Sequence, residues 1–213
     1  RELPKEAIKG AYVTGPYTLS SLIMGAEDAA ATALSSPKNL HRLCSLAARK
    51  IIEYSNELIA AGAEVICILE PSAVILGPEQ FQDFSVSYVS QIVACCQNQK
   101  ANTIYHVCGN SMHLIEKKVN SGANGISLDP KQAHVDLVQA AKKIPEEVAI
   151  IGNIDPVKTM LLGTPETVKK EVTTLMSEMK LFPNFILSTG CDLPQKTPLE
   201  NIHAFMKAGR GLS

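Results

Sequence analysis

The sequence predicts an α/β fold with a parallel sheet, because short apolar segments alternate along the chain with longer amphipathic ones. Six segments are apolar at nearly every position, as expected of parallel strands that are buried on both faces. They lie at residues 10–14, 64–69, 102–107, 125–128, 148–152 and 184–188. Strands that alternate with helices form βαβ units, so these six are expected to share one sheet.

The segments between the strands have the spacing of amphipathic helices. In the segment 40–62, apolar side chains recur every three or four residues, and Gly62 is a stop signal. The other predicted helices are 80–97, 112–120, 132–143, 167–179 and 199–207. Four helix starts place a capping residue before proline: Ser36-Pro37, Gly77-Pro78, Thr164-Pro165 and Thr197-Pro198. Thr197 with Glu200 also predicts a capping box.

Two architectures fit this alternation, an open doubly wound sheet and an eight-stranded (β/α) barrel. No Gly-x-Gly-x-x-Gly motif follows a strand and no P-loop is present, which weakens the nucleotide-binding version of the open sheet. A barrel needs about 250 residues. The 213 residues here supply six strands, so a barrel would lack its first two βα units. The residues alone leave both architectures open, and in either case we expect a single domain over residues 1–213.

The composition excludes several classes of protein. Apolar residues make up 46% of the chain and the net charge is −1, which excludes disorder and gives no electrostatic attraction for nucleic acid or an anionic membrane. No stretch approaches the ~18 apolar residues of a membrane span, and the charged first residues do not form a signal peptide. Six cysteines are too few for a disulfide scaffold of this length. We therefore expect a reduced, cytoplasmic chain with thiols free for metal binding or catalysis.

Polar residues follow almost every predicted strand, at the edge where ligands bind in either architecture. His106 and Cys108 end the third strand two residues apart, so their side chains point to the same side. Cys191 ends the sixth strand, and in a closed barrel all strand ends meet at one mouth. One imidazole and two thiolates suit Zn²⁺, with a fourth position that is open or held by a carboxylate. The alternative is a hydrogen-bonded histidine with two buried thiols.

Two carboxylates are weaker candidates. Glu70 follows the second strand. It is a candidate for a fourth metal ligand or for an acid or base, and the alternative is a solvated loop carboxylate. Asp155 follows the fifth strand, where it either orients a substrate or caps the next helix. The residues alone do not decide between these roles.

Four segments resemble the uroporphyrinogen decarboxylase superfamily. They read GAYVTGPYTL at 10–19, HVCG at 106–109, GNIDPV at 152–157 and STGCDLP at 188–194. The resemblance covers nearly the whole chain and is strongest to the zinc-dependent branch, the corrinoid methyltransferases of methanogenesis. It implies a (β/α)₈ TIM barrel of the uroporphyrinogen decarboxylase type, of which this chain covers about six βα units. It also implies that His106, Cys108 and Cys191 are the zinc ligands.

The function implied by this resemblance is transfer of a methyl group from methylcobamide to a thiol such as coenzyme M. The chain has no Asp-x-His-x-x-Gly cobalamin motif, so we expect the corrinoid on a separate partner protein. We expect catalytic roles for Glu70 and Asp155, and cofactor contacts from Tyr17, Asn153 and Asp155. Glu70 departs from the family pattern, in which Asp is expected before Pro71-Ser72.

Two other functions stay open at this point. One is a metal-free decarboxylase that acts on a tetrapyrrole, and the other is a non-catalytic barrel with structural zinc that binds a corrinoid or a partner protein. A six-stranded piece of a barrel would also expose two strand edges, so we expect it to aggregate, to form a homo-oligomer or to need the missing N-terminal part of the barrel. Neither nucleic acid nor a membrane is an expected partner.

Overall fold

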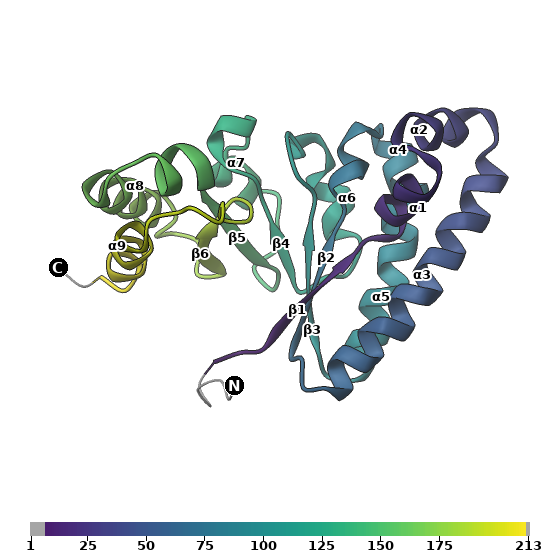
Figure 1. Cartoon of the computed structure of the whole chain (residues 1–213), viewed down its shortest axis with the longest axis horizontal. Coiled ribbons are helices and arrows are strands. Elements are labelled where there is room, and N and C mark those ends of the chain that lie inside the picture. The colour runs from purple at the N-terminus through teal and green to yellow at the C-terminus, as the bar shows by residue number, and fades with distance from the viewer. Residues whose placement is uncertain (1–6, 212–213) are drawn as a thin grey trace. The chain divides into compact units, whose positions relative to one another are not determined.

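A computed structural model of the protein describes residues 7–211, and all six predicted strands are present in it (Figure 1). They are β1 (Gly10–Thr14), β2 (Val65–Leu69), β3 (Asn102–His106), β4 (Gly125–Ser127), β5 (Ala149–Ile154) and β6 (Phe185–Thr189). The pairs β1–β2, β2–β3 and β5–β6 are parallel. Each strand lies within two residues of its predicted bounds, because continuous apolar runs mark buried parallel strands well.

The order of the strands decides between the two predicted architectures. A doubly wound sheet reverses its strand order at one point, whereas the strands of a barrel follow one another around the sheet. The described strands lie in the order β1-β2-β3-β4-β5-β6, without reversal. The α/β fold of the TIM-barrel type is therefore confirmed, and the doubly wound alternative is wrong.

Helices connect the strands throughout the described residues. They are α1 (Pro16–Met24), α2 (Ala26–Ser35), α3 (Pro37–Ala60), α4 (Pro78–Phe81), α5 (Ser87–Asn98), α6 (Ile115–Val119), α7 (Leu137–Ala141), α8 (Pro165–Glu178) and α9 (Leu199–Gly209). The predicted helix 80–97 is interrupted by a π-helical turn, η2 (Gln82–Val86). The predicted helix 132–143 is wrong in its first turn, because His134 has a left-handed backbone (φ 62°) that breaks the helix before α7.

The helix caps agree with the sequence only in part. Thr164 caps α8, since its hydroxyl accepts a hydrogen bond from the Thr167 amide at 3.3 Å. The predicted capping box of Thr197 and Glu200 is wrong. Pro198 occupies the N-cap position of α9, and the Thr197 hydroxyl donates to the Pro194 carbonyl at 2.8 Å instead.

The described residues form two compact units. The first comprises residues 7–107 and 116–126, and the second comprises 108–115 and 127–211. In the first unit, α3 and α5 lie side by side beside the strands (Figure 1) and bury apolar side chains such as Leu40 and Ile92. In the second unit, α8 packs against both α9 and β5. Within residues 7–211, no helix combines the length and the apolar character that crossing a bilayer requires.

Candidate metal centre

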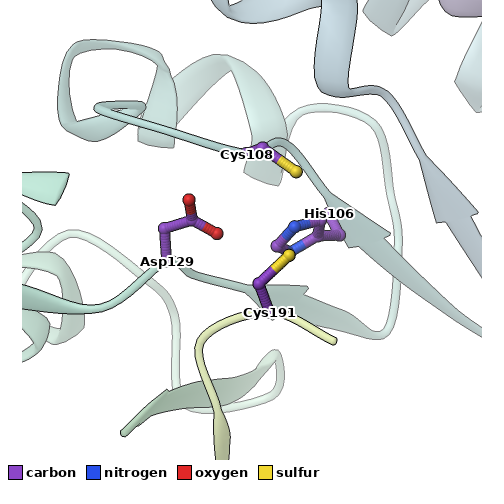
Figure 2. A group of neighbouring side chains, drawn as sticks. All are labelled: His106, Cys108, Asp129 and Cys191. Carbon is purple, nitrogen blue, oxygen red and sulfur yellow. The ribbon is translucent and has the colours of Figure 1, made fainter. Parts of the chain in front are cut away.

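Four side chains with metal-binding atoms lie together at the ends of strands or just past them (Figure 2). They are His106, Cys108, Asp129 and Cys191, and one ligand atom from each lies within 4.8 Å of those of the others. Cys108, Asp129 and Cys191 belong to the second unit, and His106 is linked to Cys108 through Val107 alone. The structure thus brings together the three residues predicted as zinc ligands and adds a carboxylate.

Strand geometry explains how distant residues reach one place. Cys108, Asp129 and Cys191 each lie two residues beyond the last residue of a strand. A glycine lets two of these loops approach closely, because a Cβ built at Gly190 would lie only 2.4 Å from the ring of Pro130. Gly190 therefore allows the end of β6, with Cys191, to lie against the loop of Asp129.

Hydrogen bonds orient Asp129 in this group. One carboxylate oxygen, Oδ2, accepts a hydrogen bond of 2.6 Å from the Gly109 amide, and the Asp129 carbonyl accepts one of 2.9 Å from the Asn153 side chain. The residue is 8% exposed. Asp129 is not among the predicted site residues, although its place just after a predicted strand is the same signal that marks Cys191.

The group holds a concentration of negative charge that favours a cation. The pKa of Cys108 is raised well above its ordinary value, first by a hydrogen bond with the Cys191 side chain and then by burial. Repulsion from Cys191, Asp129 and Asp192 raises it further. The Cys108 thiol therefore holds its proton more tightly beside Cys191 and Asp129 than it would in water. A divalent cation reverses this preference, since it binds the thiolates and releases their protons.

The donor set matches the chemistry of zinc. One imidazole nitrogen, two sulfurs and one carboxylate oxygen are the ligand types that Zn²⁺ binds, usually in a tetrahedron. Zinc bond lengths place tetrahedral ligand atoms roughly 3.3–3.8 Å apart. The four ligand atoms here all lie within 4.8 Å of one another, which is near the spacing that a tetrahedral zinc site requires.

Glu70, the other candidate for a fourth ligand, is not part of this group. Its carboxylate is fully buried, so the solvated-loop alternative is wrong. It accepts hydrogen bonds from the Tyr17 amide at 3.0 Å, the Thr18 amide at 2.7 Å and the Ser85 hydroxyl at 3.1 Å. Burial raises the pKa of Glu70 to about 6, although the hydrogen bonds from Thr18, Tyr17 and Ser85 oppose that shift.

The remaining predicted site residues have structural contacts. Tyr17 is fully buried in α1 of the first unit. The Asn153 amide donates to the carbonyls of Asp129 and Val135. Asp155 caps the π-helical segment Pro156–Leu161, since its Oδ1 accepts hydrogen bonds from the amides of Val157 at 2.8 Å and Lys158 at 2.7 Å. The capping alternative for Asp155 is confirmed, and cofactor contacts from these residues stay predictions.

With the geometry of the group known, comparison with protein families identifies the chain. A family model described as uroporphyrinogen decarboxylase (URO-D) matches residues 1–212. The chain belongs to the URO-D family. The match extends over both units of the structure, so the metal-binding group lies within a URO-D family fold.

Individual proteins resemble the chain along most of its length. Uroporphyrinogen decarboxylase of Methylobacillus flagellatus is 31% identical over 85% of this chain and 51% of its own length. That of Prochlorococcus marinus is 29% identical over 100% of this chain and 62% of its own. A solved methyltransferase from Methanosarcina mazei superposes with a TM-score of 0.85 at 23% identity, over 95% of this chain and 58% of that one. The chain thus spans between half and two thirds of these relatives' lengths.

Proposed function

We propose that this URO-D family chain is a zinc-dependent methyltransferase, which moves a methyl group from a methylated corrinoid on a partner protein to a small thiol such as coenzyme M. The observation that carries the proposal is the group of His106, Cys108, Asp129 and Cys191. A decarboxylation site has no use for two adjacent thiols and an imidazole around one point. A site that activates a thiol uses such soft donors directly.

In this proposal His106, Cys108 and Cys191 hold the zinc, with Asp129 as the fourth ligand. When bound, zinc lowers the pKa of a thiol that approaches it, so that the sulfur is ionised at neutral pH. The two cysteine thiolates donate negative charge, which keeps the substrate sulfur nucleophilic. The sulfur then bonds to the methyl carbon as the carbon–cobalt bond breaks and leaves its electron pair on cobalt, and the thiol proton passes to solvent.

Asp129 fits the role of a ligand that can be replaced. Carboxylate oxygen is a harder donor than thiolate, so it is the member of this set from which zinc is most easily released. The hydrogen bond from the Gly109 amide to Oδ2 keeps the carboxylate oriented beside the group. The site then has a position for the substrate thiol without loss of its two sulfur ligands.

A second candidate is decarboxylation of a tetrapyrrole, which the names of the curated relatives favour. It predicts turnover without metal and an activity that Cys191→Ser leaves unchanged. The third candidate, a non-catalytic barrel, predicts a zinc that keeps all four protein ligands when thiols are added. Zinc-dependent methyl transfer from free methylcobalamin to coenzyme M separates the proposed function from the other two, and metal-free decarboxylation of a tetrapyrrole separates the second candidate from the third.

Metal content tests the proposal through the ligands themselves. We expect one zinc per chain in the purified native protein, and less than a tenth of that in Cys108→Ala and Cys191→Ala, because loss of a thiolate leaves too few ligands. Cys95→Ala is the matched control, since Cys95 lies on α5 outside the group. Elemental analysis after purification without chelator gives the result. A native protein without zinc, or zinc retained by both ligand variants, would contradict the proposal.

A further inference from the structure

A buried polar network in the first unit connects the carboxyl end of β2 to β3. Glu70, Ser85 and Tyr105 are all fully buried. The Glu70 carboxylate accepts hydrogen bonds from two main-chain amides of α1. It also accepts a hydrogen bond of 3.1 Å from the Ser85 hydroxyl. The Ser85 oxygen in turn lies 2.6 Å from the Tyr105 hydroxyl.

The chemistry of the three groups fixes the direction of these hydrogen bonds. A carboxylate only accepts, and a serine hydroxyl has a single proton. Ser85 therefore donates to Glu70 and accepts from the Tyr105 hydroxyl. The Ser85 hydroxyl thus fills one donor and one acceptor role, and the Tyr105 hydroxyl fills its donor role, so these hydrogen bonds can run in one direction only.

The network acts on the residue next to a proposed metal ligand. Tyr105 directly precedes His106, and the Glu70 amide donates to the His106 carbonyl at 2.9 Å. Glu70 thus contacts the end of β3 in two ways. Its main-chain amide donates to the His106 carbonyl, and its side chain is connected to the Tyr105 hydroxyl through Ser85. Side chains alternate along a strand, so Tyr105 is anchored on one face while His106 projects from the other.

Two observations distinguish this network from ordinary packing. A buried carboxylate is costly, and apolar side chains of similar size would fill the space with less loss of stability. In addition, Ser85 lies in the π-helical turn η2, a rare conformation that is frequent at functional sites. The Ser85 hydroxyl of this turn lies between Glu70 and Tyr105.

We propose that Glu70 is a positioning residue that acts through Ser85 and Tyr105 to fix the imidazole of His106 for metal binding. The inference rests on the proposed function, because it concerns the same metal site. It assigns to Glu70 a role in orienting a ligand rather than in contacting substrate. It also explains why a carboxylate is kept in a place that no solvent reaches.

The variant Tyr105→Phe tests this role because it removes only the distal hydroxyl. Tyr88→Phe is the matched control: Tyr88 is also a buried tyrosine of the first unit, but its hydroxyl contacts His41 on α3, where it donates to the main-chain carbonyl at 3.0 Å and lies 2.9 Å from ring Nδ1. We expect Tyr105→Phe to raise the dissociation constant for Zn²⁺ about ten-fold, as loss of a group that orients a metal ligand does. It should also shift the visible absorption bands of the Co²⁺-substituted protein. Tyr88→Phe should change neither.

A second variant makes the test independent of how well Tyr105→Phe folds. Ser85→Ala cuts the same connection one step nearer Glu70, so it should weaken Zn²⁺ binding similarly. The double variant should then be no weaker than the worse single variant, because the two changes remove one shared link. Chelator competition gives the affinities, and urea unfolding of the metal-free proteins shows that each variant is folded.

The outcomes separate this inference from the function on which it rests. If the native protein binds Zn²⁺ but Tyr105→Phe and Ser85→Ala match Tyr88→Phe in affinity and in Co²⁺ spectrum, the positioning role is wrong and the proposed function stands. If the native protein binds no Zn²⁺, the proposed function is wrong, and the positioning role fails with it.

Discussion

Three buried carboxylates of this protein do different work because they have different neighbours. Asp129 lies with two thiols and an imidazole, where it adds a donor for a cation. Asp155 accepts two amides at the start of a helical segment and serves as its cap. Glu70 accepts hydrogen bonds from two main-chain amides at the start of α1 and from the Ser85 hydroxyl. The residue type alone does not separate these roles, but the donors around each carboxylate do.

The pKa of Glu70 predicts how stability depends on pH. The folded value of about 6 lies above the ordinary 4.5, so the folded state binds more protons than the unfolded state between these values. This contribution is fully present below pH 4.5 and is lost as the pH rises through about 6. The shift corresponds to about 2 kcal/mol of unfolding free energy.

Urea unfolding of the native protein and Glu70→Gln measures this dependence. The difference in unfolding free energy, native minus variant, should fall by about 2 kcal/mol between pH 4 and pH 7. Other titrating groups cancel in this difference, because the variant keeps them. A difference that is constant with pH, or that rises, would show that Glu70 is not the group that burial affects.

Among the elements, the junction of β1, α1 and β2 shows how closely the chain must approach itself around Glu70. The Gly15 amide donates to the Leu69 carbonyl at 2.6 Å, and α1 begins at the next residue, Pro16. A Cβ built at Gly15 would lie 2.1 Å from Cγ of Glu70. Glycine at this position therefore lets the start of α1 close over the carboxylate.

Gly15→Ala should consequently destabilise the protein by about 1–3 kcal/mol, the usual cost of overpacking a filled core. Gly10→Ala, at the start of β1, is the matched control, since a Cβ there would meet only the Val65 carbonyl, at 3.9 Å. That variant should stay within about 0.5 kcal/mol of the native protein. Thermal or urea unfolding of both gives the comparison, and equal losses would mean that the Gly15 contact is not specific.

At the scale of the whole molecule, local patterns predict more of the fold than of the site. The strands follow from continuous apolar runs, which need no knowledge of distant residues. The break at His134 and the π-helical turn at Ser85 escaped prediction, because both depend on packing around them. The strand order, which rejects the doubly wound sheet, is likewise a property of the assembled sheet.

The site shows the same division. His106 and Cys108 were recognisable as a pair because strand alternation acts over two residues. Placing Cys191 beside them requires the assumption that strand ends converge in a barrel. The family resemblance is what implies that all three residues bind zinc. Asp129 was missed and Glu70 was a candidate in its place, because only the folded chain shows which carboxylate reaches the two thiols. Burial of Glu70 depends on α1, more than fifty residues earlier in the chain.

The central claim is that one zinc ion is held by side chains from three separate parts of the chain. X-ray absorption at the zinc edge of the purified native protein tests it most directly. We predict two sulfur ligands at about 2.3 Å together with nitrogen and oxygen ligands at about 2.0–2.1 Å. A shell that contains no sulfur would contradict the account.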